Sequence, residues 1–388
     1  MTTQEQKAIP VPQVEARAPI PKQNLRVPGP TPVPSEVMAA QAAPMINHRG
    51  PEFSAIMKRV TPRLQYFFQT ATPVLTFPAS GTGGQECAIV NAFSPGDHVV
   101  SLIIGNFGAR LANIAQAYGL QVTRVEFAWG EAADPAIVEA RLKEVAPYRG
   151  VLMTHNETST GITNDIQTLA AIVRRLSPNA LVVVDAVSSL SAVPLEMDQW
   201  DLDVVFTGSQ KGWMIPPGLM MIAASERAWE AHKTAKLPRF YFDWTSTRKA
   251  LETVWQHPMT PPVSLFYALD VALEMMLAEG REEIFARHTR AGEYVRGRVK
   301  ALGLELLATN LPYASNTVTA IKTPAGVDTK ALLQKLSSDD HIVLADGQDH
   351  MKGKIFRIGH LGYFTEADLA QAMDAVEKHL HELGFQSK

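Results

Sequence analysis

Two stretches decide the fold of this chain: Leu181-Val182-Val183-Val184-Asp185 and Thr207-Gly208-Ser209-Gln210-Lys211-Gly212. The first is an apolar run that ends in a carboxylate, which indicates a buried strand with Asp185 at its carboxyl end. The second places Lys211 just beyond the next apolar run. In a mostly parallel sheet, ligands bind beyond the carboxyl ends of the strands. We therefore expect Asp185 and Lys211 to face a common ligand site.

The pattern around these stretches predicts an α/β fold. Apolar runs alternate with helical stretches from about residue 74 to 224, as in a mostly parallel, seven-stranded-type sheet covered on both faces. The expected strands are residues 99–104, 151–154, 181–184, 204–206 and 219–223, and the expected helices are residues 84–93, 110–118, 135–145 and 166–176. A short helix is expected to begin at Ser35.

The C-terminal third predicts a smaller α+β domain. Its expected helices are residues 265–278, 284–301 and 366–383, and its expected strands are residues 315–321, 342–345 and 355–358. The domains are then a flexible, Pro- and Gln-rich arm over residues 1–25, a large domain over residues 26–263 and a small domain over residues 264–388. The first part of the large domain is expected to contact the small one.

Composition limits the possible functions. The 388 residues carry 36 Lys and Arg against 39 Asp and Glu, so no basic excess argues for binding to nucleic acid or a membrane surface. The single cysteine, Cys87, excludes an intramolecular disulfide and a thiolate metal cluster, and we expect no metal. No apolar run suits a signal peptide or a membrane helix, and the C-terminus is not the peroxisomal Ser-Lys-Leu. We expect a cytoplasmic protein.

An amine and a carboxylate at adjacent strand ends are the groups that pyridoxal phosphate (PLP) needs. The amine holds the aldehyde as a Schiff base, and the acid keeps the pyridine nitrogen protonated. Upstream, Ser80-Gly81-Thr82-Gly83-Gly84 precedes a predicted helix, and a glycine turn at a helix N-terminus suits a phosphate. Each feature alone has a plainer interpretation, because a structural turn, a capping aspartate or an exposed lysine is common.

Together these stretches resemble the class V aminotransferases, most closely the alanine–glyoxylate and serine–glyoxylate (serine–pyruvate) branch. The resemblance rests on Val183-Val184-Asp185-Ala186-Val187-Ser188-Ser189-Leu190 followed by Gly208-Ser209-Gln210-Lys211-Gly212. Further matches follow the family's order over roughly residues 25–385. They are Pro28-Gly29-Pro30-Thr31, Ser80-Gly81-Thr82-Gly83-Gly84, His155-Asn156-Glu157-Thr158-Ser159-Thr160-Gly161 and Arg357-Ile358-Gly359.

The resemblance implies a PLP enzyme of fold type I, the aspartate-aminotransferase-like fold, and a role for each matching residue. Lys211 would bind the cofactor covalently and shuttle the substrate's proton, and Asp185 would hold the ring-nitrogen proton. Phe107 would stack on the ring, although a core phenylalanine is the plainer alternative. Thr158 would hydrogen-bond the ring's phenolic oxygen.

The phosphate and the substrate carboxylate also have expected partners in this resemblance. The phosphate contacts would come from Thr82, Gly83, Gly84 and Gln210, with Thr260 contributed across a homodimer interface. His257 stands where many relatives have a tyrosine. Arg357 would clamp the substrate carboxylate, unless it forms a structural salt bridge. Gly29 would line the same carboxylate site through its backbone.

The implied reaction transfers an amino group from alanine or serine to glyoxylate, which gives glycine and a 2-oxo acid. Ureidoglycine, 2-aminoethylphosphonate or aspartate are alternative donors. A PLP lyase, a PLP-binding protein without turnover and a cofactor-free Schiff-base aldolase also remain as alternatives. Class V cysteine desulfurases need an exposed cysteine on a mobile loop late in the chain, whereas Cys87 is expected on the helix behind the phosphate turn.

Overall fold

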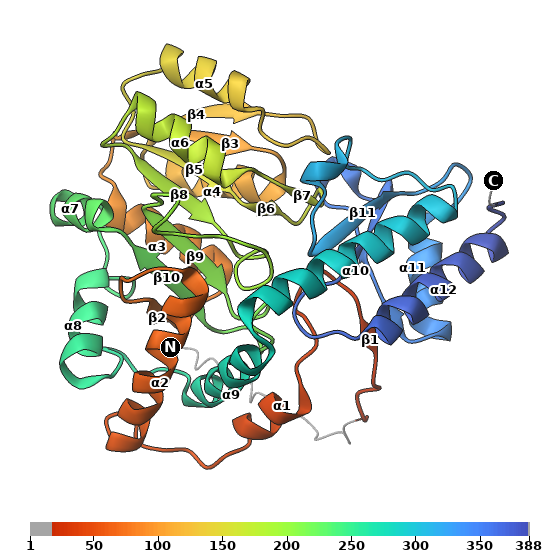
Figure 1. Ribbon diagram of the computed structural model, residues 1–388, viewed down its shortest axis with the longest axis horizontal. Coiled ribbons are helices and arrows are strands. Elements are labelled where there is room, and N and C mark those ends of the chain that lie inside the picture. Colours follow the sequence, from red (N-terminus) through yellow and green to blue (C-terminus); the bar gives the residue numbers. More distant parts are fainter. Residues whose placement is uncertain (1–17, 387–388) are drawn as a thin grey trace, which may run out of the picture.

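The computed structural model describes residues 18–386. The predicted flexible arm over residues 1–25 lies largely outside this range, and residues 18–23 form no helix or strand. In Figure 1 a large sheet with its helices occupies the left, and a smaller sheet flanked by helices occupies the right, with α10 (Arg281–Ala301) running from the middle of the view toward the right in front of β11 (Val318–Lys322). No helix of the described part of the chain is long and apolar enough to cross a membrane.

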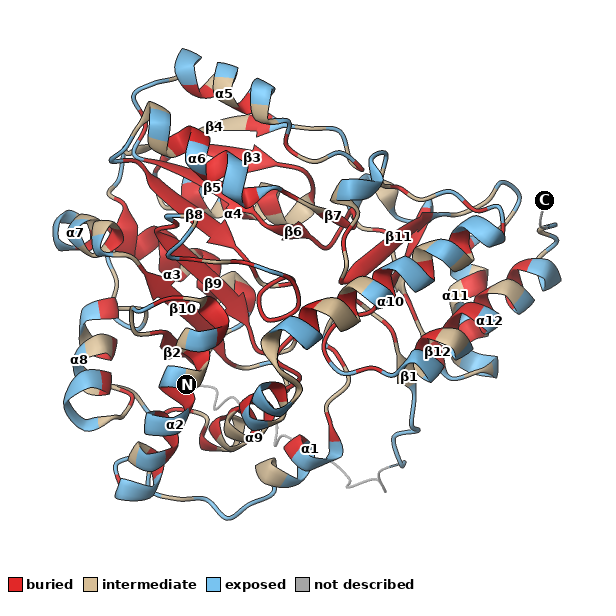
Figure 2. Cartoon of the chain, viewed as in Figure 1, coloured by how far each residue is buried: buried red, intermediate tan, exposed pale blue. Residues whose placement is uncertain are grey.

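The large sheet has seven strands in the order β2-β10-β9-β8-β5-β3-β4. β10 is antiparallel to both of its neighbours, and the other adjacent pairs are parallel, which confirms the predicted mostly parallel sheet. Every residue of β5, β8, β9 and β10 is buried, as Figure 2 shows, because helices cover both faces. The strands are β2 (Leu75–Phe77), β3 (His98–Ile103), β4 (Gln121–Glu126), β5 (Gly150–Thr154), β8 (Leu181–Asp185), β9 (Val204–Gly208) and β10 (Met220–Ala224).

The helices of this part include the four that were predicted, and two of them, α3 and α4, begin earlier than expected, α4 at Asn106 rather than at residue 110. α3 begins at Gly81 rather than at residue 84, so the glycine turn forms the first turn of the helix itself. The sequence did not predict α2, which contains Pro62, nor the edge strand β4, most of whose residues are not buried. The helices are α1 (Ser35–Gln41), α2 (Pro51–Phe68), α3 (Gly81–Ala92), α4 (Asn106–Ala117), α5 (Pro135–Glu144), α6 (Ile166–Leu176), α7 (Glu226–Thr234) and α8 (Trp244–Val254).

The smaller part of the molecule is an antiparallel sheet in the order β11-β14-β13 with three helices. Its elements are β11 (Val318–Lys322), β13 (Ala345–Asp346), β14 (Ile355–Gly359), α10, α11 (Thr329–Asp339) and α12 (Glu366–Glu382). β1 (Asn24–Leu25) pairs in parallel with β12 (Ile342–Val343), so the start of the described chain runs beside this part. Short elements complete the fold: β6 (Asn156–Glu157), β7 (Ile162–Thr163), and the 3₁₀ turns Leu311–Tyr313 and Asp349–Met351.

The hydrophobic residues form two main cores. The first surrounds the seven-stranded sheet and includes the buried face of α9 (Val263–Glu279), which packs against α1 and α2. The second begins at Ala291 within α10 and extends to Leu380. The domain boundary after residue 263 stays a prediction, and the packing places α9 with the first core.

One buried ion-pair cluster ties the amino ends of β8 and β9 to the start of α7. The Asp203 side chain is fully buried and pairs with Arg174 and Arg227. It also accepts hydrogen bonds from the Val182 N–H at 2.7 Å and from the Ser225 hydroxyl at 2.7 Å. Because these donors lose water on folding, their partner carboxylate cannot be removed cheaply.

We predict that Asp203→Ala lowers the free energy of unfolding by about 3–5 kcal/mol, because buried donors lose their acceptor. Asp201→Ala is the matched control: its side chain is about half exposed and pairs with the same two arginines. A solvent-exposed pair contributes about 1 kcal/mol or less. Equilibrium urea denaturation measures both values, and equal losses in the two variants would contradict the role of burial.

Candidate active site

A cavity of about 180 Å³ lies at the carboxyl ends of β8 and β9, where the sequence predicted a ligand site. Asp185 ends β8 and Lys211 follows β9, and both line the cavity. The structure therefore brings together the two residues from which the sequence argument began. The full lining is Ser80, Gly81, Thr82, Gln85, Phe107, Arg110, Asn156, Thr158, Asp185, Val187, Ser188, Gln210 and Lys211.

The Asp185 carboxylate is buried and held by two donors. Its Oδ2 accepts from Gln85 Nε2 at 2.8 Å, and its Oδ1 accepts from the Val187 N–H at 3.0 Å. Burial raises the pKa of Asp185 to about 6, and both hydrogen bonds oppose that rise. An acid with this pKa in a cavity can pair with a protonated ring nitrogen.

The Lys211 amine is also buried and lines the same cavity as Asp185. Its Nζ donates to the Pro28 carbonyl at 2.5 Å. Burial, with a smaller contribution from the positive charge of Arg357, lowers the pKa of Lys211 to about 8. A larger neutral fraction near pH 7 makes this amine a better nucleophile than an exposed lysine.

Gly29 makes room for this amine. Its φ is +129°, and a Cβ built there would lie 2.6 Å from Lys211 Nζ. A side chain at this position would be strained by its backbone conformation and would displace the amine. The predicted substrate contact of Gly29 is untested, and its observed neighbour is Lys211.

The N-terminus of α3 opens into the cavity through Gly81 and Thr82. The Ser80 side chain does not cap the helix, which leaves first-turn N–H groups for an anion. Gly83 and Gly84 do not line the cavity. A Cβ at Gly83 would lie 2.7 Å from the Ala79 Cβ, and one at Gly84 would lie 2.9 Å from the Phe206 ring.

Gln210 lines the cavity as the sequence predicted, and its Oε1 is buried without a hydrogen-bond donor among residues 18–386. A Cβ at Gly208 would lie 2.9 Å from this oxygen, so the glycine gives the amide its space. The amide of Gln210 has hydrogen-bonding capacity that the described chain does not use fully.

Phe107 lies in the first turn of α4, beside the cavity. The fully buried Glu157 carboxylate fixes this turn, because it accepts from the Phe107 N–H at 3.0 Å and from the Gly108 N–H at 3.1 Å. Burial raises the pKa of Glu157, and these hydrogen bonds oppose the rise. The Arg110 guanidinium lies 4.8 Å from the centre of the Phe107 ring and 3.4 Å from Thr82 Oγ1.

Three polar side chains form another part of the wall. Thr158 Oγ1 donates to Ser188 Oγ at 2.7 Å, and Asn156 Nδ2 donates to the same oxygen at 2.9 Å. Ser188 Oγ in turn donates to the Asn156 carbonyl at 2.9 Å. All three residues line the cavity, and the contact of Thr158 with a ring oxygen stays a prediction.

Arg357 lies in β14 beside this wall but does not line the cavity itself. Its Nη1 donates to the Thr158 carbonyl at 2.9 Å, while Nε and Nη2 donate to the Asp346 carbonyl at 3.0 and 2.7 Å. Burial lowers its pKa. Among the described residues no carboxylate forms an ion pair with Arg357, although the charges of Glu157 and Asp346 oppose the lowering of its pKa.

Thr260 and His257 lie apart from the cavity. Thr260 is exposed and is not a lining residue. His257 is buried, with Nε2 at 2.9 Å from the Thr76 carbonyl and Nδ1 at 3.2 Å from the Met259 N–H. His257 thus fixes the loop that carries Thr260.

Sequence reasoning assigned no role to several residues of the site. Asn156, Glu157 and Ser188 lay inside the motifs that carried the resemblance, so their positions were available although their contacts were not. Gln85 had no signal in the sequence. Cys87 is buried in α3, as predicted, and burial raises the pKa of its thiol.

Comparison with known proteins settles the family. The sequence model of the family described as Aminotransferase class-V matches residues 29–370. The chain belongs to the class V aminotransferases. This aminotransferase is a pyridoxal-phosphate enzyme with the fold type I architecture that the sequence predicted.

Individual relatives cover nearly the whole chain. The aminotransferase is 46% identical to a Synechococcus sp. protein described as "Soluble hydrogenase, small subunit", over 94% of each chain. It is 38% identical to the L-aspartate–glyoxylate aminotransferase of Paracoccus denitrificans, over 92% of this chain and 91% of that one. It is 36% identical to the serine–glyoxylate aminotransferase of Arabidopsis thaliana, over 94% and 92%. The hydrogenase name belongs to the first relative and is not applied to this chain. Among residues 18–386 here, no group of three or more His, Cys, Asp or Glu side chains could hold a metal ion.

A solved structure has the same fold. The crystal structure of alanine–glyoxylate aminotransferase from Nostoc sp. superposes on this aminotransferase with a TM-score of 0.90 and 31% sequence identity. The superposition covers 95% of this chain and 97% of that chain. The agreement therefore extends over both sheets and not over the large one alone.

We predict that PLP attaches to Lys211 at a rate that rises with pH up to about 8 and then levels off, because the neutral amine attacks the aldehyde. Below that pH the neutral fraction grows about tenfold per pH unit. Cofactor-free protein is mixed with PLP and quenched with borohydride at timed intervals. Mass spectrometry of the Lys211 peptide then measures the rate of attachment. Free Nα-acetyl-lysine is the control, and its rate should keep rising beyond pH 8.

Lys211→Ala separates this amine from the other lysines. The variant should carry no borohydride-fixed cofactor. Fixation on a different lysine of the wild-type protein would contradict the assignment of Lys211.

Proposed function

We propose that this class V aminotransferase transfers an amino group from alanine or serine to glyoxylate, giving glycine and a 2-oxo acid. The observation that carries the proposal is one cavity in which the buried side chains of Asp185 and Lys211 meet, with Arg357 held beside it. Relatives named for serine–glyoxylate and aspartate–glyoxylate transfer, and a neighbour named for alanine–glyoxylate transfer, support glyoxylate as acceptor.

The residues of the cavity fit PLP. The open N-terminus of α3 at Gly81 and Thr82 would hold the phosphate together with Gln210, which lines the cavity and whose side-chain NH₂ can donate to a phosphate oxygen. Asp185 would hold the ring nitrogen, and Phe107 would stack on the ring. When bound, PLP supplies an aldehyde that reacts with amines and a pyridine ring that accepts electrons.

The chain's own groups then divide the work of the reaction. Lys211 Nζ would take the proton from the substrate's Cα and return it on the product side, which its lowered pKa favours. The hydroxyl of Thr158, which donates to Ser188 Oγ here, would turn its one hydrogen to the oxygen on the cofactor ring. Arg357 would bind the substrate carboxylate through its planar guanidinium, which forms no direct ion pair with a carboxylate of the described chain.

The number of carboxylates on the acceptor is limited by the number of positively charged side chains that can bind them. Arg357 is the one cation for which the family resemblance implies a carboxylate partner. A dicarboxylate such as 2-oxoglutarate would bring a second buried charge, at a cost of several kcal/mol if that charge stays unpaired. Glyoxylate has no second carboxylate and avoids this cost.

A panel of glyoxylate, pyruvate, oxaloacetate and 2-oxoglutarate, each with alanine and with serine as donor, tests the proposal. We predict that glyoxylate has the highest kcat/KM, at least about tenfold above 2-oxoglutarate. The measurement is the initial rate of amino-acid formation at several acceptor concentrations. A clear preference for 2-oxoglutarate would contradict the proposal.

Aspartate as donor is the second candidate, and Arg110 favours it. The Arg110 guanidinium lines the cavity, and no carboxylate among the described residues forms an ion pair with it. It could pair with the distal carboxylate of aspartate. If aspartate exceeds alanine and serine in kcat/KM, and Arg110→Gln removes that advantage alone, the donor is aspartate and the acceptor remains glyoxylate.

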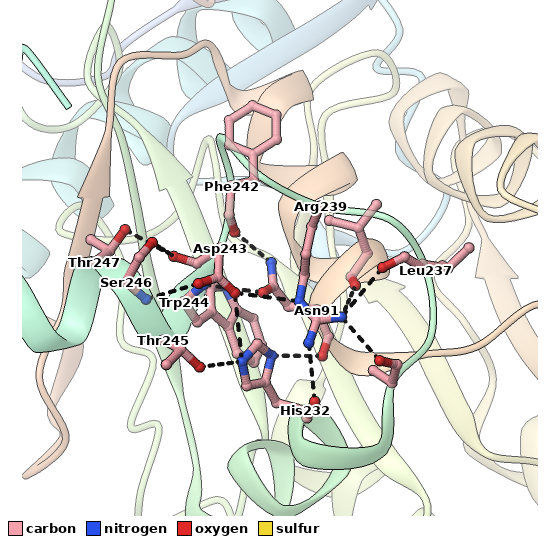
Figure 3. A network of polar contacts seen from close by, with 12 residues as sticks. Asn91, His232, Leu237, Arg239, Phe242, Asp243, Trp244, Thr245, Ser246 and Thr247 are labelled. Atoms are coloured by element: carbon pink, nitrogen blue, oxygen red, sulfur yellow. Dashed lines mark hydrogen bonds and ion pairs between the residues drawn. The ribbon is translucent and has the colours of Figure 1, made fainter. Parts of the chain in front are cut away.

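We also propose a homodimer with a shared active site, in a cytoplasmic protein. An exposed aromatic pair, Phe240 and Tyr241, lies on a loop whose backbone is held by a network of buried hydrogen bonds. Figure 3 shows Asn91 at the centre of that network: it donates to the Phe242 carbonyl at 2.7 Å and accepts from the Trp244 N–H at 3.2 Å. Ordered, exposed aromatic side chains are typical of protein interfaces.

This loop lies next to the phosphate turn. A Cβ at Gly83 would lie 3.3 Å from the Phe242 ring, so a second copy docked on Phe240 and Tyr241 would stand close to the α3 N-terminus. Thr260 is exposed and would then be available to the other subunit's phosphate.

Co-expression of Lys211→Ala and Thr260→Ala subunits tests the shared site. Each mixed dimer would hold one site with both lesions and one with neither, so the mixture should recover about one quarter of wild-type activity if pairing is random. The measurement is the specific activity of the purified mixture against each parent. No recovery, or a fully active monomer, would contradict a shared site.

A further inference from the structure

Gln85 is a buried glutamine in the second turn of α3, behind the phosphate turn. Its Nε2 donates to Asp185 Oδ2 at 2.8 Å and to the Phe107 carbonyl at 3.3 Å. One amide group therefore touches both the carboxylate expected at the ring nitrogen and the backbone of the residue expected on the ring face. Gln85 also lines the cavity.

The chemistry of its neighbours fixes the orientation of this amide. Both partners of Nε2 are acceptors, so an inverted amide would place Oε1 against a carboxylate and a carbonyl. Both hydrogens of the NH₂ group are used. Oε1 has no donor among the described residues.

Packing alone does not account for a glutamine at this position. A buried polar atom without a partner costs free energy, and an apolar side chain of similar size would avoid that cost. The hydrogen bond to Asp185 is charge-assisted, which makes it stronger than a neutral one. The NH₂ group of Gln85, and not its Oε1, is therefore the part of the side chain for which we expect a function.

We propose that Gln85 is a positioning residue that holds the Asp185 carboxylate ionised and in plane toward the ring nitrogen of the bound cofactor. This inference rests on the proposed role of Asp185. The Val187 N–H holds Oδ1 and Gln85 holds Oδ2, so two donors from different segments fix the carboxylate plane. The second N–H of Gln85 donates to the Phe107 carbonyl. The same amide thus fixes the position of Phe107, the residue proposed to stack on the ring face, relative to Asp185, the residue proposed to contact the ring nitrogen.

Removing the Gln85 donor would change where the proton of the pair lies. Burial already favours the neutral form of Asp185, and the Gln85 hydrogen bond opposes it. Without that bond the carboxyl group becomes more basic and takes the proton from the ring nitrogen. A ring without that proton withdraws electrons less strongly, so the proton-transfer step slows.

The test uses the holoenzyme of Gln85→Met, which keeps the side-chain volume and removes the donor. The ¹⁵N chemical shift of ring-labelled PLP should move toward that of a neutral pyridine at pH 7. The kcat should fall about 10- to 100-fold, as expected for a lost hydrogen bond to a charged group, while KM changes by less than about threefold. Glu86→Met on the same helix, where Glu86 contacts the Tyr118 hydroxyl at 3.1 Å, is the matched control and should behave as wild type.

Gln85→Glu gives a second, isosteric arm. A protonated glutamic acid can still donate to Asp185, whereas an ionised one repels it, so the loss of kcat should deepen as the pH rises. A purely structural role predicts no such pH dependence relative to wild type.

The outcomes separate this inference from the proposed function. A wild-type ¹⁵N shift and kcat in Gln85→Met overturn the role of Gln85 alone. If Gln85→Met does not fold, a pH-independent activity ratio of Gln85→Glu to wild type overturns it. If wild-type protein takes up no PLP, the proposed function fails. If Asp185→Ala leaves the ring shift unchanged, the proposed role of Asp185 fails, and the inference about Gln85 fails with it.

Discussion

The site depends on holding a carboxylate and an amine of opposite charge in one buried cavity without a direct ion pair between them. Burial moves the two pKa values toward each other, to about 6 for Asp185 and about 8 for Lys211. Placing such groups in a protein interior costs several kcal/mol unless fixed dipoles replace water. Here the Val187 N–H and the Gln85 amide serve the carboxylate, and the Pro28 carbonyl serves the amine. The surrounding fold supplies these partners from three separate segments.

The segment after β1 is one physical link between the two sheets. Its Arg26 carbonyl accepts from the N–H of Gly359 at 2.6 Å, and Gly359 is the last residue of β14, the strand that carries Arg357. Its Thr31 N–H donates to the Gln210 carbonyl at 3.0 Å, and the Thr31 hydroxyl donates to the Lys211 carbonyl at 3.0 Å. A few extended residues thus connect the proposed carboxylate clamp to the lysine, which explains why Pro28 and Gly29 lie against the amine.

The sequence was sufficient for five of the seven strands of the large sheet and for the pair at its edge, because buried strands are apolar throughout and two of them end next to the residues that face the ligand. It was not sufficient for α2, whose Pro62 breaks the usual helical pattern, or for β4, whose mostly unburied residues hide a strand. Gln85 could not be found in this way. Its role arises from a contact with a residue 100 positions away, and no local pattern encodes that contact.

The start of α3 has a consequence for the shape of any bound molecule. Gly81 faces the cavity at the helix N-terminus, and Gln85 stands four residues later on the same rigid helix. At 1.5 Å per residue, the two positions are separated by about 6 Å along the helix axis. This rigid helix therefore fixes the distance between the anion end of the cavity and Asp185 at its other end. A cofactor analogue with a longer arm between ring and phosphate could make the contacts at one of these ends but would lose those at the other.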